Sequence, residues 1–144
     1  MGRQEIQVEA HSSAPLEAVF SIVADGARWP TCTPLGSFTL ERFDADGNEG
    51  PGAMRVFSTG PFRTREQVVE VTPPRHFSYV MVSGLPIRNY RADIDLEARP
   101  DGTLLHWRAA FEAKVPGTGW LFRSYLKRFL QQSATGIAAA ASAD

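Results

Sequence analysis

Arginine side chains on predicted strands are the residues of this sequence with the clearest capacity for chemistry. A buried guanidinium directed at developing negative charge can stabilise an enolate. Alternation along a strand places Arg55 on the same face as Phe57, and Arg65 on the same face as Val69 and Val71. We therefore expect Arg55 and Arg65 to point inward, where they are candidate catalytic residues.

The opposing interpretation treats the strand arginines as ordinary surface residues of an antiparallel sheet. By the same alternation, Arg91 and Arg108 point outward, opposite the apolar face. Such side chains pair across strands with carboxylates, and the available partners are Glu66, Glu70, Asp93 and Asp95. The sequence leaves both interpretations open for Arg55 and Arg65.

Two tyrosines, Tyr79 and Tyr90, are further candidates for polar contacts with a ligand. Each combines an apolar ring with one hydroxyl, which suits a ligand that carries a carbonyl or hydroxyl group. Tyr79 is also a candidate catalytic residue. The alternative is that both are core tyrosines whose hydroxyls bind the backbone.

Other chemistry has little support in the sequence. The three histidines, His11, His76 and His106, lie on separate segments without the spacing of a metal site. Cys32 has no neighbouring base that could activate it. We expect no metal and no cofactor.

One acidic segment, Asp44-x-Asp46-x-Asn48, superficially resembles a calcium-binding loop. The sixth position of such a loop requires glycine, but Glu49 stands there. A tight hairpin turn at residues 46–48 is the better interpretation.

Length and composition indicate one globular domain over residues 1–144. The net charge of −1 gives no basic stripe for nucleic acid. No apolar run approaches the ~20 residues that cross a bilayer, and residues 1–7 lack the apolar segment of a signal peptide. We expect a cytoplasmic protein, a monomer or weak homodimer, without a nucleic-acid partner or a membrane span.

The order of predicted elements is typical of an α+β domain. A strand at residues 4–11 precedes a helix at 14–24 and a second short helix or loop at 27–34. Turn residues then delimit the remaining predicted strands, at residues 37–44, 53–59, 63–71, 76–83, 88–98 and 103–113.

After a break at residues 116–119, the apolar period becomes helical, with an aromatic face and a cationic face. Gly136 would weaken this helix by ~1 kcal/mol relative to alanine, so the helix either ends there or continues into the alanine-rich end. The break is a hinge in this interpretation.

A helix of this length covers an antiparallel sheet only along a line, which leaves space for a small apolar molecule. Large side chains from the helix, the strands and the short helical segment would then contact the ligand. The predicted ligand-binding residues are Trp29, Phe57, Tyr79, Met81, Tyr90, Trp107, Phe111, Phe122, Tyr125, Leu126 and Phe129.

The layout resembles the helix-grip fold of the START-like and Bet v 1-like (SRPBCC) superfamily, in its polyketide cyclase/dehydrase and lipid-transport branch. The residues that carry the resemblance are 14–20, Asp25, Trp29-Pro30, Gly52-Ala53-Met54, 66–71, Pro74-Arg75, Tyr79 and Gly84-Leu85-Pro86, followed by the terminal helix.

The resemblance implies a curved sheet of about seven strands around the C-terminal helix, with one or two short helices after the first strand. It also implies an apolar cavity that binds lipids, polyketides or aromatic molecules. We expect ligand binding first. The alternatives are a cyclase or dehydrase that uses an inward Arg with Tyr, and a protein-interaction module of the chaperone co-regulator kind.

Overall fold

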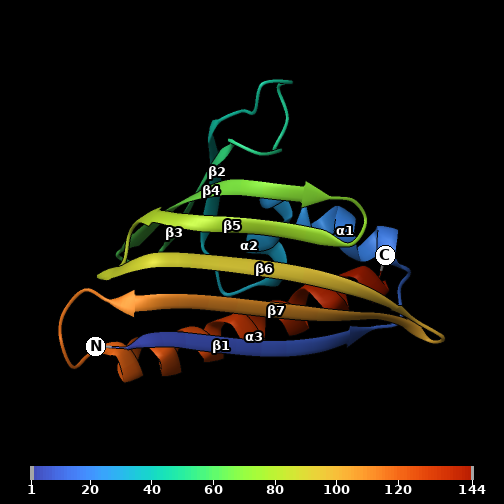
Figure 1. The fold of residues 1–144 in the computed structure, drawn as a ribbon. Coiled ribbons are helices and arrows are strands. Elements are labelled where there is room, and N and C mark those ends of the chain that lie inside the picture. The colour runs from blue at the N-terminus through green and yellow to red at the C-terminus, as the bar shows by residue number, and fades with distance from the viewer. Residues whose placement is uncertain (1, 144) are drawn as a thin grey trace.

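A seven-stranded antiparallel sheet and one long helix dominate the computed structural model, which describes residues 2–143 (Figure 1). The strand order is β1-β7-β6-β5-β4-β3-β2. This arrangement confirms the predicted α+β helix-grip fold. The strands are β1 (Arg3–Ser12), β2 (Ser37–Arg42), β3 (Met54–Thr59), β4 (Phe62–Thr72), β5 (His76–Ser83), β6 (Ile87–Arg99) and β7 (Gly102–Ala113), and the long helix is α3 (Gly119–Ala143).

Three short helical segments connect β1 to β2, as the turn and capping residues predict. They are α1 (Leu16–Val23), the 3-10 turn η1 (Gly26–Arg28) and α2 (Trp29–Cys32). Pro15 precedes α1, and the Asp25 side chain accepts the backbone N–H of Ala27 at 3.2 Å. The Trp29 indole donates to the Ile22 carbonyl at 3.0 Å, which holds α2 against the end of α1.

Helix α3 runs along the β1 edge of the sheet instead of its centre (Figure 1). The Arg123 guanidinium donates to the Glu5 carbonyl at 2.9 Å, and the Ser12 hydroxyl donates to the Ala138 carbonyl at 2.8 Å. Side-chain contacts of this kind protect an edge strand, which would otherwise expose unpaired backbone groups. The half of the sheet formed by β3, β4 and β5 is consequently left free to border a pocket.

Gly136 does not end α3, which continues to Ala143. A Cβ atom at Gly136 would overlap the carbonyl oxygen of Cys32. The glycine therefore allows the backbones of α2 and α3 to approach each other closely, at the cost of some intrinsic helix stability.

The connection between β2 and β3 is longer than the tight turn expected at residues 46–48. Strand β2 ends at Arg42, and the loop is organised by the Asp44 carboxylate. This carboxylate accepts the backbone N–H groups of Asp46, Asn48 and Gly50 at 2.9, 2.7 and 3.0 Å. These hydrogen bonds, the first of them from Asn48, lower the pKa of Asp44.

The expected inward orientation of Arg65 is wrong, because β4 contains an irregularity that reverses its alternation. The pairing with β5 shifts between Val68 and Glu70, so that Val69 is an extra residue. Before Val69, the inward side chains are those at even positions, such as Val68; after it, Val71 packs against the core. Arg65 instead binds Glu41 on the outer face of the sheet, with Nη2 and Oε2 2.6 Å apart.

Arg55 points inward as expected and is fully buried. Its Nε donates to Glu49 Oε1 at 3.0 Å, and its Nη2 donates to the Val23 carbonyl at 3.4 Å. The guanidinium also lies over the rings of Trp29 and Phe77, at 4.8 and 4.9 Å from their centroids. Burial lowers the pKa of Arg55, while Glu49 opposes that shift.

None of the helices within residues 2–143 combines the length and the apolar character that crossing a membrane requires.

Replacing Glu49 by alanine should destabilise the fold by about 3 kcal/mol, because it leaves a buried cation without its partner carboxylate. The Glu41→Ala variant is the matched control, since the Arg65–Glu41 pair is over one-third exposed on average and contributes less than about 1 kcal/mol. Urea unfolding of both variants and the parent protein measures the difference. Equal losses in the two variants would contradict a special role for the buried pair.

Candidate functional site

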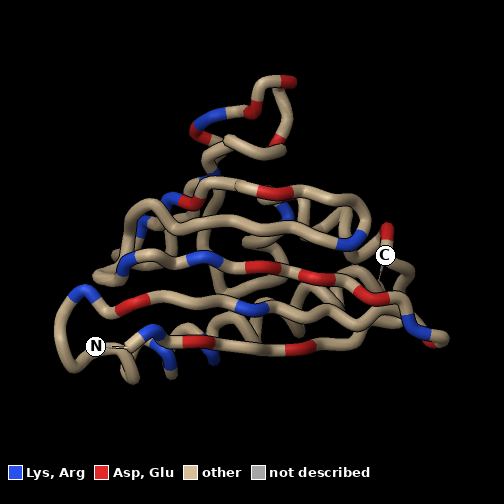
Figure 2. Tube along the Cα trace, viewed as in Figure 1, with Lys and Arg blue, Asp and Glu red and all other residues tan. Residues whose placement is uncertain are grey.

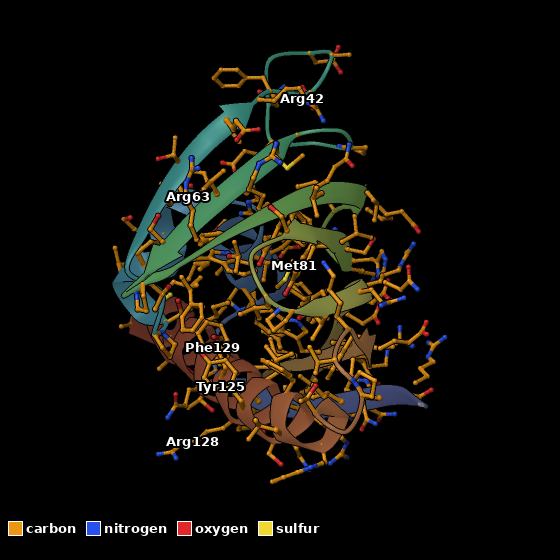
Figure 3. All side chains as sticks on the ribbon, turned by 90° about the vertical axis from the view of Figure 1, so that its left-hand side faces the viewer. Arg42, Arg63, Met81, Tyr125, Arg128 and Phe129 are labelled. Carbon is orange, nitrogen blue, oxygen red and sulfur yellow. The ribbon has the colours of Figure 1, made fainter. Side chains whose placement is uncertain are left out.

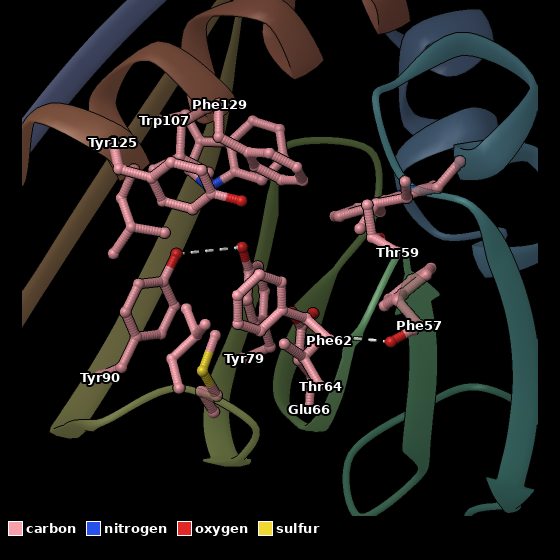
Figure 4. Close-up of a pocket in the computed structure, with 16 residues that line it drawn as sticks. Phe57, Thr59, Phe62, Thr64, Glu66, Tyr79, Tyr90, Trp107, Tyr125 and Phe129 are labelled. Atoms are coloured by element: carbon pink, nitrogen blue, oxygen red, sulfur yellow. Dashed lines mark hydrogen bonds between the residues drawn. The ribbon is translucent and has the colours of Figure 1, made fainter. Parts of the chain in front are cut away.

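A pocket lies between α3, the short helix α2 and strands β3 to β7 (Figure 4). Its free volume is about 50 Å³, and it reaches the surface between Phe62 and Tyr125, which are 47% and 48% exposed. In an end-on view, Tyr125 and Phe129 of α3 lie on one side of the space, across from Met81 (Figure 3). The lining residues are Trp29, Leu35, Phe57, Thr59, Phe62, Thr64, Glu66, Tyr79, Met81, Leu85, Tyr90, Trp107, Tyr125, Leu126, Phe129 and Leu130.

Most of the predicted ligand-binding residues line this one pocket. The exceptions are Phe111 and Phe122. Phe111 is buried beside Tyr90, with ring centroids 6.4 Å apart, and Phe122 packs against the core from α3. Contact between any of these side chains and a ligand stays a prediction.

Trp29 is the centre of the aromatic cluster at the pocket. Its ring stacks on Phe57 with centroids 5.5 Å apart and meets Trp107 and Tyr79 edge-on at 5.4 and 6.2 Å. Such offset and edge-on contacts are the favourable geometries for aromatic pairs. The cluster gives the pocket a rigid apolar side that is built from α2 and three different strands.

Glu66 is the one carboxylate among the pocket-lining residues, and the sequence analysis missed this role. The sequence predicts Glu66 only as a surface partner for strand arginines. In the structure Glu66 is 7% exposed, and its side chain points inward from β4. Its Oε1 atom makes no hydrogen bond within residues 2–143. Burial raises the pKa of Glu66 to about 7, although the nearby Arg55 charge acts in the opposite direction.

Two buried hydroxyls complete the polar part of the pocket. Tyr79 and Tyr90 lie on neighbouring strands, and their hydroxyl oxygens are 3.4 Å apart (Figure 4). Burial raises the pKa of Tyr79 well above its ordinary value, and it raises the pKa of Tyr90 as well. Both tyrosines are therefore neutral hydrogen-bonding groups at physiological pH.

A buried donor lies next to these groups. The Trp107 indole Nε1 has no partner with hydrogen-bond geometry among the described residues, although it lies close enough to the Tyr79 hydroxyl to act against the rise in the pKa of that group. Nη1 of Arg55 has no hydrogen-bond partner among these residues either. Buried polar atoms normally have partners, so each unpaired one requires an explanation. Glu66 and Trp107 both line the pocket, where a polar group of a ligand could satisfy them.

Arg55 does not line the pocket, although it lies directly behind it. Its guanidinium is held by Glu49 and covered by the rings of Trp29, Phe57 and Phe77. Its effect on the pocket is electrostatic, through Glu66 and Tyr79. A direct contact between Arg55 and a substrate would require these rings to move.

The other chemical candidates lie away from the pocket. His76 binds Asp95 at 2.7 Å on the opposite face of the sheet. Cys32 is partly buried and donates to the Arg28 carbonyl, and its burial raises the pKa of the thiol. Within residues 2–143, no cluster of His, Cys, Asp and Glu side chains is arranged to hold a metal ion.

Sequence reasoning also missed Leu130 of α3 and several lining residues from connections and strand ends, namely Leu35, Thr59, Phe62, Thr64 and Leu85. Leu130 carried a usable signal, because it lies one helical turn from Leu126 on the apolar face of α3. The others depend on how the α2–β2, β3–β4 and β5–β6 connections lie against the sheet.

Three solved structures with this fold have low sequence identity to this chain. The crystal structure of Ara h 8.0201 has a TM-score of 0.78 and 18% identity, covering 99% of this chain and 100% of its own. A START superfamily protein from Mycobacterium smegmatis has a TM-score of 0.78 and 18% identity over 92% of both chains. The protein XoxI from Bacillus cereus has a TM-score of 0.74 and 16% identity, covering 100% of this chain and 97% of its own. These similarities show that the chain has the helix-grip fold of these proteins.

The chain belongs to the polyketide cyclase / dehydrase and lipid transport family, whose model matches residues 3–142. Comparison with curated protein sequences gives no match. Family and fold together point to a superfamily of proteins that bind small hydrophobic ligands.

Replacing Glu66 by glutamine should change the pH dependence of stability in a defined direction. Because burial raises the pKa of Glu66 from 4.5 to about 7, the folded state holds a proton that the unfolded state releases between these values. Protonated Glu66 therefore makes its full contribution to the free energy of unfolding below pH 4.5, and this contribution is lost as the pH rises through 7. The parent protein should therefore lose on the order of 3 kcal/mol relative to Glu66→Gln between pH 4.5 and pH 8.

Urea unfolding of the parent and of Glu66→Gln at both pH values measures this difference. All other titrating groups are shared by the two proteins, so their contributions cancel. A difference that is independent of pH would show that Glu66 titrates in its ordinary range.

Proposed function

We propose that the protein binds a small, largely apolar molecule that carries one or two polar groups, in the pocket between α3 and the sheet. The observation that carries the proposal is the lining itself. It joins an aromatic side around Trp29 to the Glu66 carboxyl, whose Oε1 has no hydrogen-bond partner among the described residues, and to the buried Trp107 N–H beside Tyr79. A few polar groups in an otherwise apolar pocket are typical of small-molecule sites.

The size of the pocket indicates how a ligand enters. A free volume of about 50 Å³ is well below the ~300 Å³ at the lower end of pockets for drug-sized ligands. Tyr125 and Phe129 lie at the surface end of the pocket with their rings 6.3 Å apart, and both belong to the first half of α3. Rotation of these two side chains enlarges the pocket without disturbing the sheet. Residues 116–119 remain the proposed hinge for any larger movement of α3.

Filling the pocket should abolish binding of an apolar probe. The Thr64→Phe variant places a ring in the pocket from β4, and we expect it to weaken binding of anilinonaphthalene sulfonate at least tenfold by fluorescence titration. Thr72→Phe, at the exposed far end of the same strand, is the matched control and should bind like the parent. Circular dichroism of both variants establishes that they fold. Unchanged probe affinity in folded Thr64→Phe would overturn this site for ligand binding.

A second candidate function, cyclisation or dehydration of a polyketide-like substrate, is favoured by Glu66 and the two tyrosines. A carboxyl group with a pKa near 7 can accept a proton from the carbon next to a carbonyl and later donate it to a departing hydroxyl, so that water is lost. Tyr79 could hold the carbonyl oxygen. In this reaction Arg55 acts from behind the pocket, as a charge that favours the anionic form of Glu66.

The enzyme proposal is tested with a synthetic 1,5-diketone thioester, whose ring closure and loss of water are followed by liquid chromatography. Glu66→Gln keeps the size of the side chain but removes the acid, and it should lower the rate at least a hundredfold. Glu41→Gln, on the outer face, should leave the rate unchanged. If probe binding is intact and the parent protein gives no product above buffer, the enzyme proposal fails and the binding proposal stands.

A further inference from the structure

Exposed apolar side chains gather at one end of the molecule. Apart from Phe43, the exposed large hydrophobic residues in the described part of the chain are Phe62, Val82, Val115, Trp120, Leu121 and Tyr125. They lie in the β3–β4 hairpin, at the end of β5, after β7 and in the first turns of α3. The strand registers place these segments at the same end of the strands, because Arg65 pairs with Ser83 and Ile87 with Ala113.

Basic side chains surround these apolar residues. They are Arg63, Arg88, Lys114, Arg123, Lys127 and Arg128. All of them except Arg123 are exposed, and none forms an ion pair with another described residue. Figure 2 marks the positions of Lys and Arg along the backbone in blue, several of them toward its left-hand side. Residues 119–143 contain no Asp or Glu, although the whole chain carries a net charge of −1. We call the apolar and basic residues named here the entrance surface.

The entrance surface surrounds the opening of the pocket. Phe62 and Tyr125 belong to it and also line the pocket. Figure 3 views the molecule from this end: Tyr125 and Phe129 lie beside the space between α3 and the sheet, whereas Arg63 lies on the outer side of the strands and Arg128 projects from α3 away from the space. Trp120 is 68% exposed, more than any other large hydrophobic residue described. Exposing such a side chain in water is costly unless a partner covers it.

We propose that the entrance surface docks onto an anionic lipid bilayer. Trp and Tyr favour the interface between headgroups and acyl chains, and Lys and Arg beside them are attracted to anionic headgroups. The apolar side chains come from three connections and one helix end, and they are mixed with basic residues. A fluid bilayer requires no matched shape.

This docking gives the pocket a direct route to the membrane. An apolar ligand would pass between bilayer and pocket past Phe62 and Tyr125 without crossing water. The proposal concerns the surface alone, and it holds whether or not the pocket also catalyses a reaction.

Co-sedimentation with vesicles tests the proposal. The protein should bind vesicles of 70% phosphatidylcholine and 30% phosphatidylserine, and it should bind pure phosphatidylcholine at least tenfold more weakly. Each removed cation should weaken binding about fivefold, so Lys127→Gln/Arg128→Gln should lose about 25-fold. Trp120→Ala should also weaken binding at least fivefold.

Matched controls come from the rest of the surface. Phe43→Ala removes the exposed aromatic residue outside the entrance surface, and Arg75→Gln removes an exposed cation at the β4–β5 turn, at the opposite end of the sheet. Both controls should bind like the parent. Absence of vesicle binding, or equal losses in controls and test variants, overturns the proposal. So does a dimer in analytical ultracentrifugation that Trp120→Ala dissociates, because the surface would then bind a second copy of the chain.

Discussion

The burial of the Arg55 guanidinium is the constraint on which much of the rest of the structure depends. A cation inside a protein is tolerated only where hydrogen bonds and opposite charge compensate for its lost hydration. Glu49 supplies the charge, the Val23 carbonyl accepts a hydrogen bond, and the rings of Trp29 and Phe77 cover the guanidinium. These groups come from four separate segments, so the arginine on β3 ties together the end of α1, α2, the β2–β3 loop and β5. Gly26 belongs to the same arrangement, because a Cβ atom there would meet Arg55 Nε and the Phe38 ring.

The same constraint determines the electrostatics of the pocket. Glu49 and Glu66 both lie near Arg55, but the hydrogen bond goes to Glu49, which is partly exposed and keeps some contact with water. Glu66 receives only a longer-range attraction, which does not offset its burial. The pocket therefore contains a carboxyl group with a pKa near neutrality, although a buried arginine lies close by. The arginine that the sequence suggested as the reactive group instead modulates the charge of the group that faces the pocket.

The fold and the apolar part of the pocket could be predicted from the sequence, because both follow from periodicity. Tyr90 and Trp107 alternate with polar residues in the sequence, and Leu126 and Phe129 follow the helical period, so periodicity predicts their inward orientation. This holds for Tyr90 although the pairing of β6 with β7 shifts between Arg88 and Arg91. Glu66 and Arg65 could not be assigned correctly in the same way. Their orientation depends on the extra residue Val69, which reverses the alternation of β4 without a glycine or proline to mark it. A single bulge thus exchanged the residue that faces the pocket for the one that faces solvent.

The position of α3 links the enclosed site to its surroundings. A helix over the centre of the sheet would fill the space in front of β5 and β6, where Tyr79 and Tyr90 lie. Contacts such as Arg123 to the Glu5 carbonyl hold α3 along the β1 edge instead, which leaves the region beside Trp29 open. Helix α3 begins beside β1, where Gly119 approaches the Gln4 side chain, and its first turn leaves Trp120 and Leu121 68% and 50% exposed. The same helix thus contributes Tyr125, Leu126, Phe129 and Leu130 to the pocket and leaves the apolar side chains of its first turn exposed at this end of the protein.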